Sequence, residues 1–582
     1  MSRQHVPAVV GLVAGALVTV PVTAAGAAPS PPPPQQRPPA TVPAVPVVPA
    51  APGVPAPPGV GAATPPAPAV PGPGTAPPVP PAPPLLAPPA AAPSPAAPGG
   101  AVAGPERPGT AKPPGPAKPA APAKPAVPAK PAVPAKPAVP AKPTVPPKPP
   151  AAPGVIDVPC SVPHLLTAIR AANGTAAPET LRLAPGCTYR LAAGANPFHP
   201  VNGLPVITGT MTVDGQGATI TRAATAPRFR ILLVGRTARL TMLDTTISGG
   251  SATDCPAYPD VPGMACGGGI ANLGQMFLTR SRVTGNRAES KLYAQGAGID
   301  NPGNATVRSS VVSGNTVAYS GSEHGGAAAG GGIANDGPLT VEGAQVINNL
   351  AWVREDTGSF AFGSGIAAMA QSTVKNSVIR GNRASAPGGF ARAAVTNSAP
   401  AASGRMTVTG SFVRGNVADA PDGAAQGGGI TNSASMTVDN THVSGNTVTA
   451  RGGTARGGGI RLGPRSELKL LRSSVVGNVV DASEGVAQGG GLDNPDGGTL
   501  ETTRSRIINN TVTAQDGTAL GGGLYHAVGT STLDRTVING TRAIDGGGIF
   551  RRSGTVRLLG SQVMFNTPNN CRPTDSVRGC VG

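Results

Sequence analysis

Aromatic and charged residues are scarce in this sequence. Only 3% of its 582 residues are Phe, Trp or Tyr, and 12% are charged. Residues 29–154 contain no aromatic residue and consist mainly of Pro, Ala, Gly and Val, so this segment cannot build a hydrophobic core. We therefore expect the folded part of the chain to lie within residues 155–582.

Lysine runs that alternate with aromatic residues are also missing. The formal net charge is +18, but in the folded part it comes from single arginines scattered among Ser, Thr, Asn and Gly. This distribution argues against a specific nucleic-acid site. We expect no nucleic-acid partner.

Beyond the N-terminus, no apolar run is long enough to cross a bilayer. At the N-terminus, Arg3 precedes an apolar run over residues 6–22, and a small-x-small cleavage site precedes Ala28. A membrane anchor, the alternative, would need a longer run without prolines. We predict a signal peptide over residues 1–27 and a secreted protein with no transmembrane segment after cleavage.

Cysteines are few, and none are arranged as metal ligands usually are. No Cys-x-x-Cys spacing occurs, and only His164 lies close to a cysteine in sequence, so we expect no metal and no cofactor. Export permits disulfides. The six cysteines form three couples that are local in sequence, which we predict to be disulfides: Cys160 with Cys187, Cys255 with Cys266, and Cys571 with Cys580.

Residues 28–154 are predicted to be a disordered arm, because proline fixes φ, removes a donor and favours extended polyproline II. A Lys-Pro-Ala-Val-Pro-Ala pattern places a lysine at every sixth position: Lys112, Lys118, Lys124, Lys130, Lys136, Lys142 and Lys148. At about three residues per turn, these lysines fall on one edge. Two interpretations stay open, a solubilising spacer and a comb that binds cell-wall or acidic polysaccharide.

Residues 155–174 are predicted to form an N-terminal cap. Ser161 can cap a helix with Pro163 in its first turn, and Gly174 can end it. One face of this helix is apolar and consists of Leu165, Leu166, Ile169 and Ala172. A repeat array needs such a cover over its first hydrophobic layer, and the first cysteine couple would staple it there.

Helical periodicity is absent after Asn173, and a repeated motif takes its place. Gly-Gly-Gly-Ile-Ala-Asn begins at Gly267, and variants of it begin at Gly296, Gly330, Gly363, Gly427, Gly457, Gly489, Gly521 and Gly546. Between copies, an aliphatic residue is followed three positions later by an asparagine: Asn286, Asn315, Asn349, Asn382, Asn416, Asn446, Asn478 and Asn510. A period of roughly 25 to 35 residues indicates stacked units of one supersecondary type.

Each period contains a Gly-Ile strand, a Thr-Val-x-x-Ser-x-Val strand and a variable loop, which is the content of one coil of a parallel β-helix. We expect two or three short strands per coil, paired about 4.8 Å apart with those of the next coil. The Ile or Val should point inward, and the glycines should allow positive φ at a corner. The asparagines should form a structural ladder inside one turn, with no catalytic or metal role.

These repeats resemble a known family. Alternation of Gly-Gly-x-Ile with aliphatic-x-x-Asn is similar to the repeats of chlamydial polymorphic outer membrane proteins and to secreted β-helix proteins of the pectate-lyase-like superfamily. Segments 158–160, 185–189, 203–205 and 217–220 resemble the opening of actinobacterial members. We therefore expect an all-β fold, a single right-handed parallel β-helix over residues 175–570, with a disulfide-closed tail over 571–582.

Acidic residues are sparse and mostly solitary within their periods, which disfavours an enzyme. Asp300 and Asp493 follow equivalent glycines but lie several coils apart, so we expect that they cannot meet. The Asn-Thr-Asp, Asp-Asp and Gly-His-Gly signatures of polygalacturonases do not occur in the sequence. The paired carboxylates that glycosidases require are therefore not visible.

The best candidate site consists of the variable loops of three consecutive periods, which stacking would place side by side. Aromatic residues in these loops suggest a sugar-binding surface made of Tyr293, Tyr319, Trp352, Phe360 and Phe362. The groups that an enzyme could use for catalysis there are Glu323, His324, Glu355 and Asp356. The alternative is that Trp352, Phe360 and Phe362 only bury one another under long loops.

Three functions remain open at this stage. The first is a non-enzymatic surface or wall-associated protein whose β-helix binds glycan or a protein partner. The second is a carbohydrate-active enzyme, a polysaccharide lyase or glycoside hydrolase, as the pectate-lyase-like resemblance implies. The third is a structural spacer, in which the arm and the β-helix only add length.

The arm can be tested by exchanging its seven lysines for glutamine, which keeps the proline spacing and removes the charge. If the lysines contact an anionic polymer, retention on isolated cell wall should fall steeply with salt, because exposed charges are screened within about 8–10 Å. The glutamine variant should then lose retention as fully as a deletion of residues 29–153. Wild-type retention in the glutamine variant would leave the spacer interpretation.

Overall fold

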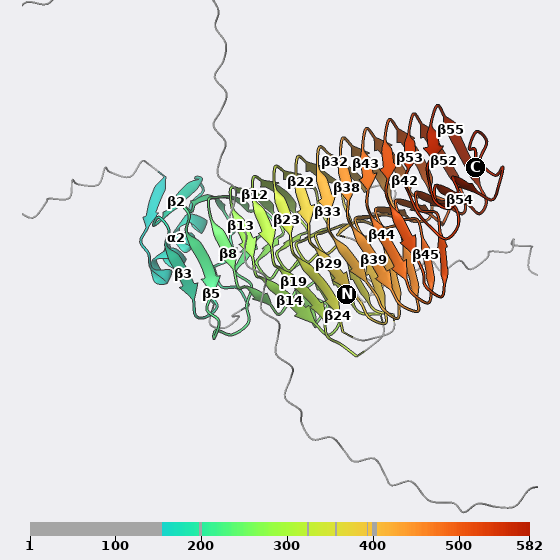
Figure 1. Ribbon diagram of the computed structural model, residues 1–582. Helices are drawn as coiled ribbons and strands as arrows, with labels where there is room; N and C mark the ends of the chain where they lie inside the picture. The colour runs from blue at the N-terminus through green and yellow to red at the C-terminus, as the bar shows by residue number, and fades with distance from the viewer. Residues whose placement is uncertain (1–153, 197–200, 323–324, 355–357, 393, 399–403) are drawn as a thin grey trace, which may run out of the picture. The chain divides into compact units, whose positions relative to one another are not determined.

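The structure, a computed structural model, describes residues 154–196, 201–322, 325–354, 358–392, 394–398 and 404–582. The predicted signal peptide and nearly all of the predicted arm lie outside these residues, so both stay predictions. The described chain folds, as expected, into an all-β, right-handed parallel β-helix with very little helix (Figure 1).

Three parallel sheets form the body of the β-helix. Sheet A has 14 strands, from β1 (Val155–Val158) to β55 (Thr555–Leu559). Sheet B has 13 strands, from β3 (Thr188–Leu191) to β56 (Gln562–Met564), and sheet C has 12, from β6 (Leu232–Val234) to β57 (Cys571–Arg572). Their aliphatic side chains share one core, and the isoleucines of the glycine motif point into it as predicted.

Two further sheets form a wing on this body. Sheet D has 9 strands, from β9 (Ser251–Ala252) to β49 (Thr511–Thr513), and sheet E has 9, from β10 (Met264–Cys266) to β50 (Thr518–Leu520). A full coil runs through sheets E, C, A, B and D, as in β10, β11 (Ile270–Asn272), β12 (Gln275–Thr279), β13 (Arg282–Thr284) and β14 (Arg287–Ser290). The expectation of two or three strands per coil is therefore wrong, because the variable loops contain strands.

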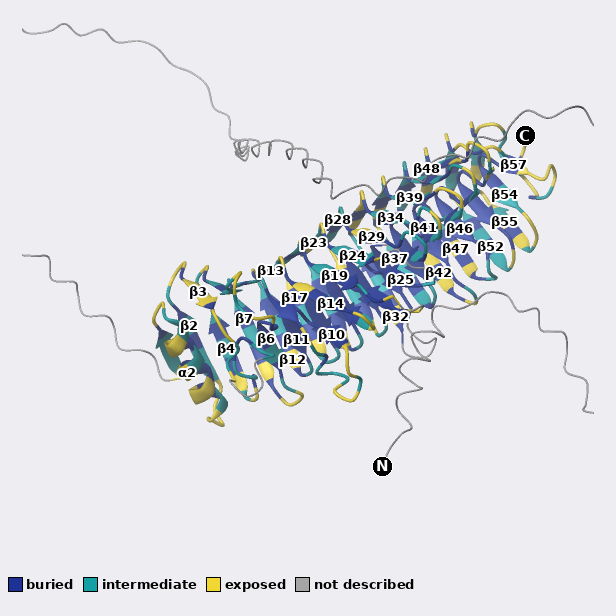
Figure 2. Ribbon diagram, turned by 90° about the horizontal axis from the view of Figure 1, so that it is seen from below, coloured by how far each residue is buried: buried dark blue, intermediate teal, exposed yellow. Residues whose placement is uncertain are grey.

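The wing has a core of its own, made mostly of alanine. Side chains such as Ala288, Ala294 and Ala351 are fully buried between sheets D and E. Alanine has low strand propensity, so these short strands lack the aromatic and β-branched enrichment by which a strand is recognised in sequence. Figure 2 shows buried residues along the strands and exposed residues mainly at the turns.

Body and wing meet at a waist, where the glycine motif lies against the asparagine ladder. The first glycine, Gly267, has a φ of +64° and turns the chain from sheet E into sheet C. A Cβ on Gly268 would lie 2.2 Å from the carbonyl oxygen of Arg287, and a Cβ on Gly269 would lie 2.8 Å from Nδ2 of Asn286. The first glycine thus supplies the positive φ that we expected, whereas the other two are required by close approach.

The predicted asparagine ladder is confirmed. Nδ2 of Asn382 donates to the carbonyl oxygen of Val346 at 2.9 Å and to Oδ1 of Asn416 at 3.0 Å. Oδ1 of Asn382 accepts from the backbone nitrogen and from Nδ2 of Asn349, both at 3.0 Å. The side-chain bonds repeat from Asn286 to Asn510, so these buried amides tie the coils together.

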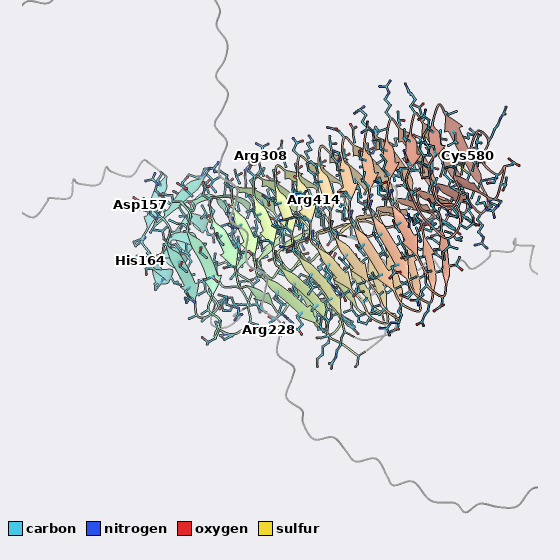
Figure 3. All side chains as sticks on the ribbon, in the orientation of Figure 1. Asp157, His164, Arg228, Arg308, Arg414 and Cys580 are labelled. Carbon is cyan, nitrogen blue, oxygen red and sulfur yellow. A yellow bond between two sulfur atoms is a disulfide. The ribbon has the colours of Figure 1, made fainter. Side chains whose placement is uncertain are left out.

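Both ends of the β-helix carry a disulfide. Helix α2 (Val162–Asn173) covers the N-terminal end, and its buried face consists of Leu165, Ala168, Ile169 and Ala172. Ser161 occupies the N-cap position but makes no side-chain cap hydrogen bond, contrary to our expectation. All three predicted disulfides are present. Figure 3 shows His164 at the capped end and Cys580 at the opposite end.

The waist can be tested by adding a methyl group to one of its glycines. In Gly268→Ala the new Cβ would meet the backbone carbonyl of Arg287, where the same coil leaves the body, so we expect the free energy of unfolding to fall by about 3 kcal/mol, as in other overpacked sites. Gly452→Ala is the control, because a Cβ there meets nothing within 4 Å. Thermal unfolding should show a lower midpoint for Gly268→Ala alone, and equal midpoints would refute the account of the waist.

Candidate functional site

The outward faces of sheets C and E meet along the inner angle between body and wing, and we call this surface the C–E face. It carries the middle residue of each sheet C strand and the first and third residues of each sheet E strand, since their neighbours point into the two cores. From β6 to β54 (Ile549–Arg551), the middle residues of sheet C are, in register, Leu233, Ala271, Asp300, Ala334, Ala367, Thr396, Thr431, Arg461, Asp493, Tyr525 and Phe550. The third residues of sheet E are Cys266, Gln295, Ala329, Phe362, Arg392, Gln426, Arg456, Gln488 and Leu520.

The N-terminal part of the C–E face holds two carboxyl groups. Nε2 of Gln295 donates to Oδ1 of Asp300 at 2.8 Å and to Oδ2 of Asp336 at 3.2 Å. Burial, and then the charge of Asp336, raises the pKa of Asp300 well above its usual value, and burial also raises the pKa of Asp336. The two acids belong to successive coils, so each is still solitary within its own coil, as expected, and the turn after β21 (Ile333–Asn335) brings the second acid to the amide of Gln295.

Phenylalanines occupy the middle of the C–E face. Phe360 of β25 (Phe360–Phe362) stacks on Phe390 of β30 (Phe390–Arg392), with ring centroids 4.9 Å apart. Phe362 is buried beside them and packs in the same cluster as Ala367 of sheet C. An apolar patch thus separates the acidic end from the part that follows.

The C-terminal part of the face carries an arginine cluster, which consists of Arg392, Arg456, Arg461, Asp493 and Asp496. Arg392 and Arg461 are only 7% and 6% exposed, and Asp493 is fully buried. Arg461 pairs through Nη2 with Oδ2 of Asp496 at 2.6 Å, and its Nε lies 3.7 Å from Oδ2 of Asp493. Three arginines therefore face two carboxyl groups, which leaves an excess of positive charge.

Burial shifts the pKa values of this cluster in opposite directions. Burial raises the pKa of Asp493 to about 7, although the nearby guanidinium groups of Arg461 and Arg456 oppose the shift. Burial and the charge of Arg461 lower the pKa of Arg392 to about 9. Both shifts reduce the charge that the face must hold away from water.

Buried polar atoms without a hydrogen-bond partner concentrate on the C–E face. Of eighteen such side-chain atoms in the described residues, nine are here: Oδ2 of Asp300, Nε of Arg392, Oγ1 of Thr396, Oε1 of Gln426, Nε of Arg456, Nε of Arg461, Oε1 of Gln488 and both carboxyl oxygens of Asp493. Each costs about 1–3 kcal/mol when it stays unpaired. A polar ligand on this face would satisfy them, and we therefore choose it as the candidate site.

The predicted aromatic site is divided between different faces of the wing. Tyr293, Phe360 and Phe362 come together on the C–E face. Tyr319 is buried in the alanine core, whereas Trp352 of β24 (Leu350–Val353) alternates with core residues and lies on the outer face of sheet D. The catalytic candidates Glu323, His324, Glu355 and Asp356 lie outside the described residues. Whether any of these residues binds or reacts stays a prediction.

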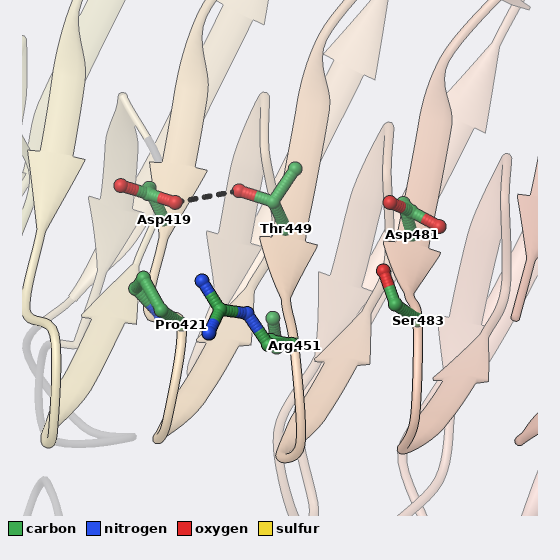
Figure 4. Close-up of a pocket in the computed structure, with 7 residues that line it drawn as sticks. Asp419, Pro421, Thr449, Arg451, Asp481 and Ser483 are labelled. Atoms are coloured by element: carbon green, nitrogen blue, oxygen red, sulfur yellow. Dashed lines mark hydrogen bonds between the residues drawn. The ribbon is translucent and has the colours of Figure 1, made fainter. Parts of the chain in front are cut away.

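A separate hollow of about 180 Å³ lies on the outer face of sheet D, lined by residues that include Asp419, Thr449, Arg451 and Asp481 (Figure 4). Its two carboxyl groups are bonded within the protein, and Oδ1 of Asp481 accepts from Oγ1 of Thr513 at 2.8 Å. Oγ1 of Thr449 donates to Oδ1 of Asp419 at 2.7 Å, and Nη2 of Arg383 donates to Oδ2 of Asp419 at 2.7 Å. This hollow therefore has less need of a ligand than the C–E face.

The arginine cluster and Asp336 were not predicted from the sequence, although the sequence contains one pattern that indicates the arginines. Arg392, Gln426, Arg456 and Gln488 all lie one residue before the first glycine of a repeat or of its degenerate equivalent. Polar residues at one fixed position before the glycines would have indicated a polar column. The partners in sheet C lie four or five residues further on, across the positive-φ corner.

The buried carboxyl group of Asp493 predicts a pH dependence. Its pKa rises from 3.8 in the unfolded chain to about 7 in the fold, so its contribution to stability is fully present below pH 3.8 and is lost as the pH rises to about 7. We expect Asp493→Asn to reduce the fall of the unfolding midpoint between pH 4 and pH 7. Asp516→Asn changes an exposed residue, so its unfolding midpoint should depend on pH as that of the wild type does. If the midpoint falls equally with pH in all three proteins, the pKa of Asp493 is not raised by burial.

Comparisons with known proteins identify no family for this chain. No family model matches the chain, and no curated protein matches it. Among solved structures, it is similar to the A-module of the Azotobacter vinelandii mannuronan C-5 epimerase AlgE6, with 16% identity over 72% of this chain and 94% of the other and a TM-score of 0.34. The AlgE4 A-module of the same organism gives 15% identity over 69% and 92%, with a TM-score of 0.28. Similarity at this level carries no argument about activity, and the pectate-lyase-like family stays a resemblance.

Proposed function

We propose that this chain is an exported protein that binds an acidic polysaccharide through the C–E face, at the arginine cluster and the adjoining phenylalanines. One observation carries this proposal: three arginines lie on one face, the Nε atom of each has no hydrogen-bond partner among the described residues, and one of the three, Arg392, lies beside Phe390. Two other features of the C–E face support the proposal: the chemistry of its side chains and the course of its columns along the axis of the β-helix.

The chemistry suits carboxylate groups on sugars. Guanidinium groups bind carboxylates by paired, charge-assisted hydrogen bonds, which are about twice as strong as neutral ones. Burial strengthens such bonds because water competes less for the same atoms. Phe390 and Arg392 extend from the same strand on the same side, so one ligand could contact both an aromatic ring and a guanidinium group.

The geometry suits an extended polymer. The two columns of the C–E face run along the axis of the β-helix, and successive coils repeat at about 4.8 Å. Arg392 and Arg456 in sheet E are two coils apart, with Gln426 between them. A linear chain that lies parallel to the axis would meet two cationic groups of this column, separated by one coil that carries a neutral glutamine.

Export is supported by the cysteines. All six are paired and none is free, which is typical of proteins that fold in an oxidising compartment. Among the described residues, no helix has the length and apolar character to cross a membrane. With the predicted signal peptide, these features support a protein that acts outside the cell, at a surface or wall.

Asp493 favours a second function, acid–base chemistry on the bound polysaccharide. A catalytic acid or base works best when its pKa is near the working pH, and the pKa of Asp493 is raised to about 7. Arg461 precedes it and Tyr525 follows it in the column of sheet C. A lyase or hydrolase would use such a group beside the cation that holds the sugar carboxylate.

Binding to polygalacturonate, with neutral dextran as the reference polymer, tests the proposal. We expect Arg456→Gln and Arg461→Gln each to weaken binding roughly ten-fold, the loss of about one charge-assisted hydrogen bond, and binding to decrease with salt. Arg506→Gln is the matched control, because Arg506 is exposed on sheet B. Equal effects of all three substitutions, or equal binding of dextran, would refute the arginine cluster as the site.

The same assay separates the remaining alternatives. Loss of binding in Phe390→Ala with full binding in Trp352→Ala supports the C–E face, whereas the reverse result moves the site to the outer face of sheet D. Release of reducing ends or unsaturated sugars by the wild type, abolished in Asp493→Asn, would establish the enzyme. Binding without release leaves the binding protein.

A further inference from the structure

The acidic end of the C–E face lies beneath a loop that other coils lack. Between β9 and β10, residues 253–263 connect sheet D to sheet E, and a disulfide between Cys255 and Cys266 closes this loop. Tyr258 of the loop and Tyr293 of the face pack around the disulfide. Burial raises the pKa of both tyrosines, and the nearby charges of Asp336 and Asp300 raise it further.

No cation of the described chain pairs with these two carboxyl groups. Arg230 is the basic residue that influences Asp300, but its Nη2 is bonded to Oδ1 of Asp254 at 2.6 Å and to the carbonyl oxygen of Cys266 at 3.1 Å. Its Nη1 donates to Oδ1 of Asn202 at 3.1 Å. The partners of the two acids are therefore neutral: both accept from the amide of Gln295, and Asp336 also accepts a hydrogen bond from the hydroxyl group of Tyr258.

One carboxyl oxygen of the acid pair, Oδ2 of Asp300, indicates that a ligand belongs at this position. Asp300 is fully buried, and its Oδ2 has no hydrogen-bond partner among the described residues. Burial of an ionised carboxyl group is costly unless a cation compensates it or a proton neutralises it. Either a proton or a metal ion must therefore accompany this pair at neutral pH.

The available donor atoms suit a hard cation. The two sulfur atoms lie close to the Asp300 carboxyl group, but they are bonded to each other and cannot act as thiolates. A half-turn of the Gln295 amide exchanges its nitrogen and oxygen and directs Oε1 at the two carboxyl groups. The set then consists of oxygens, which Ca²⁺ accepts in flexible geometry.

We propose that Asp300 and Asp336, together with the amide oxygen of Gln295, bind a divalent cation of the Ca²⁺ class beneath the disulfide-closed loop. The ion would neutralise the acid pair and supply the partner that Oδ2 of Asp300 lacks. It would also join strands of two successive coils, since Gln295 and Asp300 precede Asp336 by one coil. This site is independent of the arginine cluster and of polysaccharide binding.

In the first experiment, full-length protein is treated with a chelator and titrated with CaCl₂ at pH 7.5. Calorimetry measures the heat of binding, and thermal unfolding measures the effect of Ca²⁺ on stability. We expect one binding event and an unfolding midpoint that rises with the concentration of Ca²⁺. Asp300→Asn and Asp336→Asn should abolish both effects, because each removes a charged ligand. Asp260→Asn is the control, since Asp260 is exposed in the same loop, and it should bind as the wild type does.

A second measurement does not depend on how the variants fold. Tyrosine transfers energy to bound Tb³⁺, so the wild type should give terbium emission on excitation of tyrosine, and CaCl₂ should quench it by displacement. Tyr258→Phe should reduce this emission while Ca²⁺ still binds. Absence of both heat and emission in the wild type, or equal loss in Asp260→Asn, would overturn the proposal and leave the acid pair protonated.

Discussion

The close approach of two backbone strands at the waist is the constraint on which the rest of the structure depends. Each coil enters the body beside the asparagine at which it later leaves the body, and the second and third glycines of the motif leave just enough room for this. A side chain at either position would separate the strand that enters the wing from the one that leaves it. The waist therefore keeps two cores, one aliphatic and one of alanine, in a single coil.

The C–E face follows from that waist. The positive φ of the first glycine bends the chain back on itself, so the outward side chains of sheets C and E face each other instead of water. For this reason residues such as Arg392 and Thr396 are buried although they point away from both cores. Because register is fixed by the waist and the ladder, residue identity on this face can change from coil to coil without changing the backbone. An acidic end, an aromatic middle and an arginine cluster can therefore lie on one continuous scaffold.

The sequence predicts the body of this fold well and the site poorly, for physical reasons. Isoleucine and asparagine recur at fixed positions because each must stack on its equivalent, so the pattern is visible without any structure. The strands of the wing lie in segments that the sequence predicts to be variable loops, because their core consists mostly of alanine and alanine has low strand propensity. Asp336 and Asp300 meet only because one lies in the turn after its strand and the other in the coil before. Such a contact depends on the angle between two sheets, which no spacing in the sequence records.

The ladder and the C–E face show two outcomes of the same repetition. In the ladder, every coil offers the same amide, so donors and acceptors match and Asn382 has a partner for each of its bonds. On the C–E face, arginine is followed by glutamine and then by arginine, so neighbouring coils do not complete each other's hydrogen bonds. Substituting apolar residues there would remove the unpaired atoms and, by the usual cost of such groups, stabilise the fold. The polysaccharide binding and the cation site that we propose would explain why this face keeps buried arginines and acids at the expense of stability.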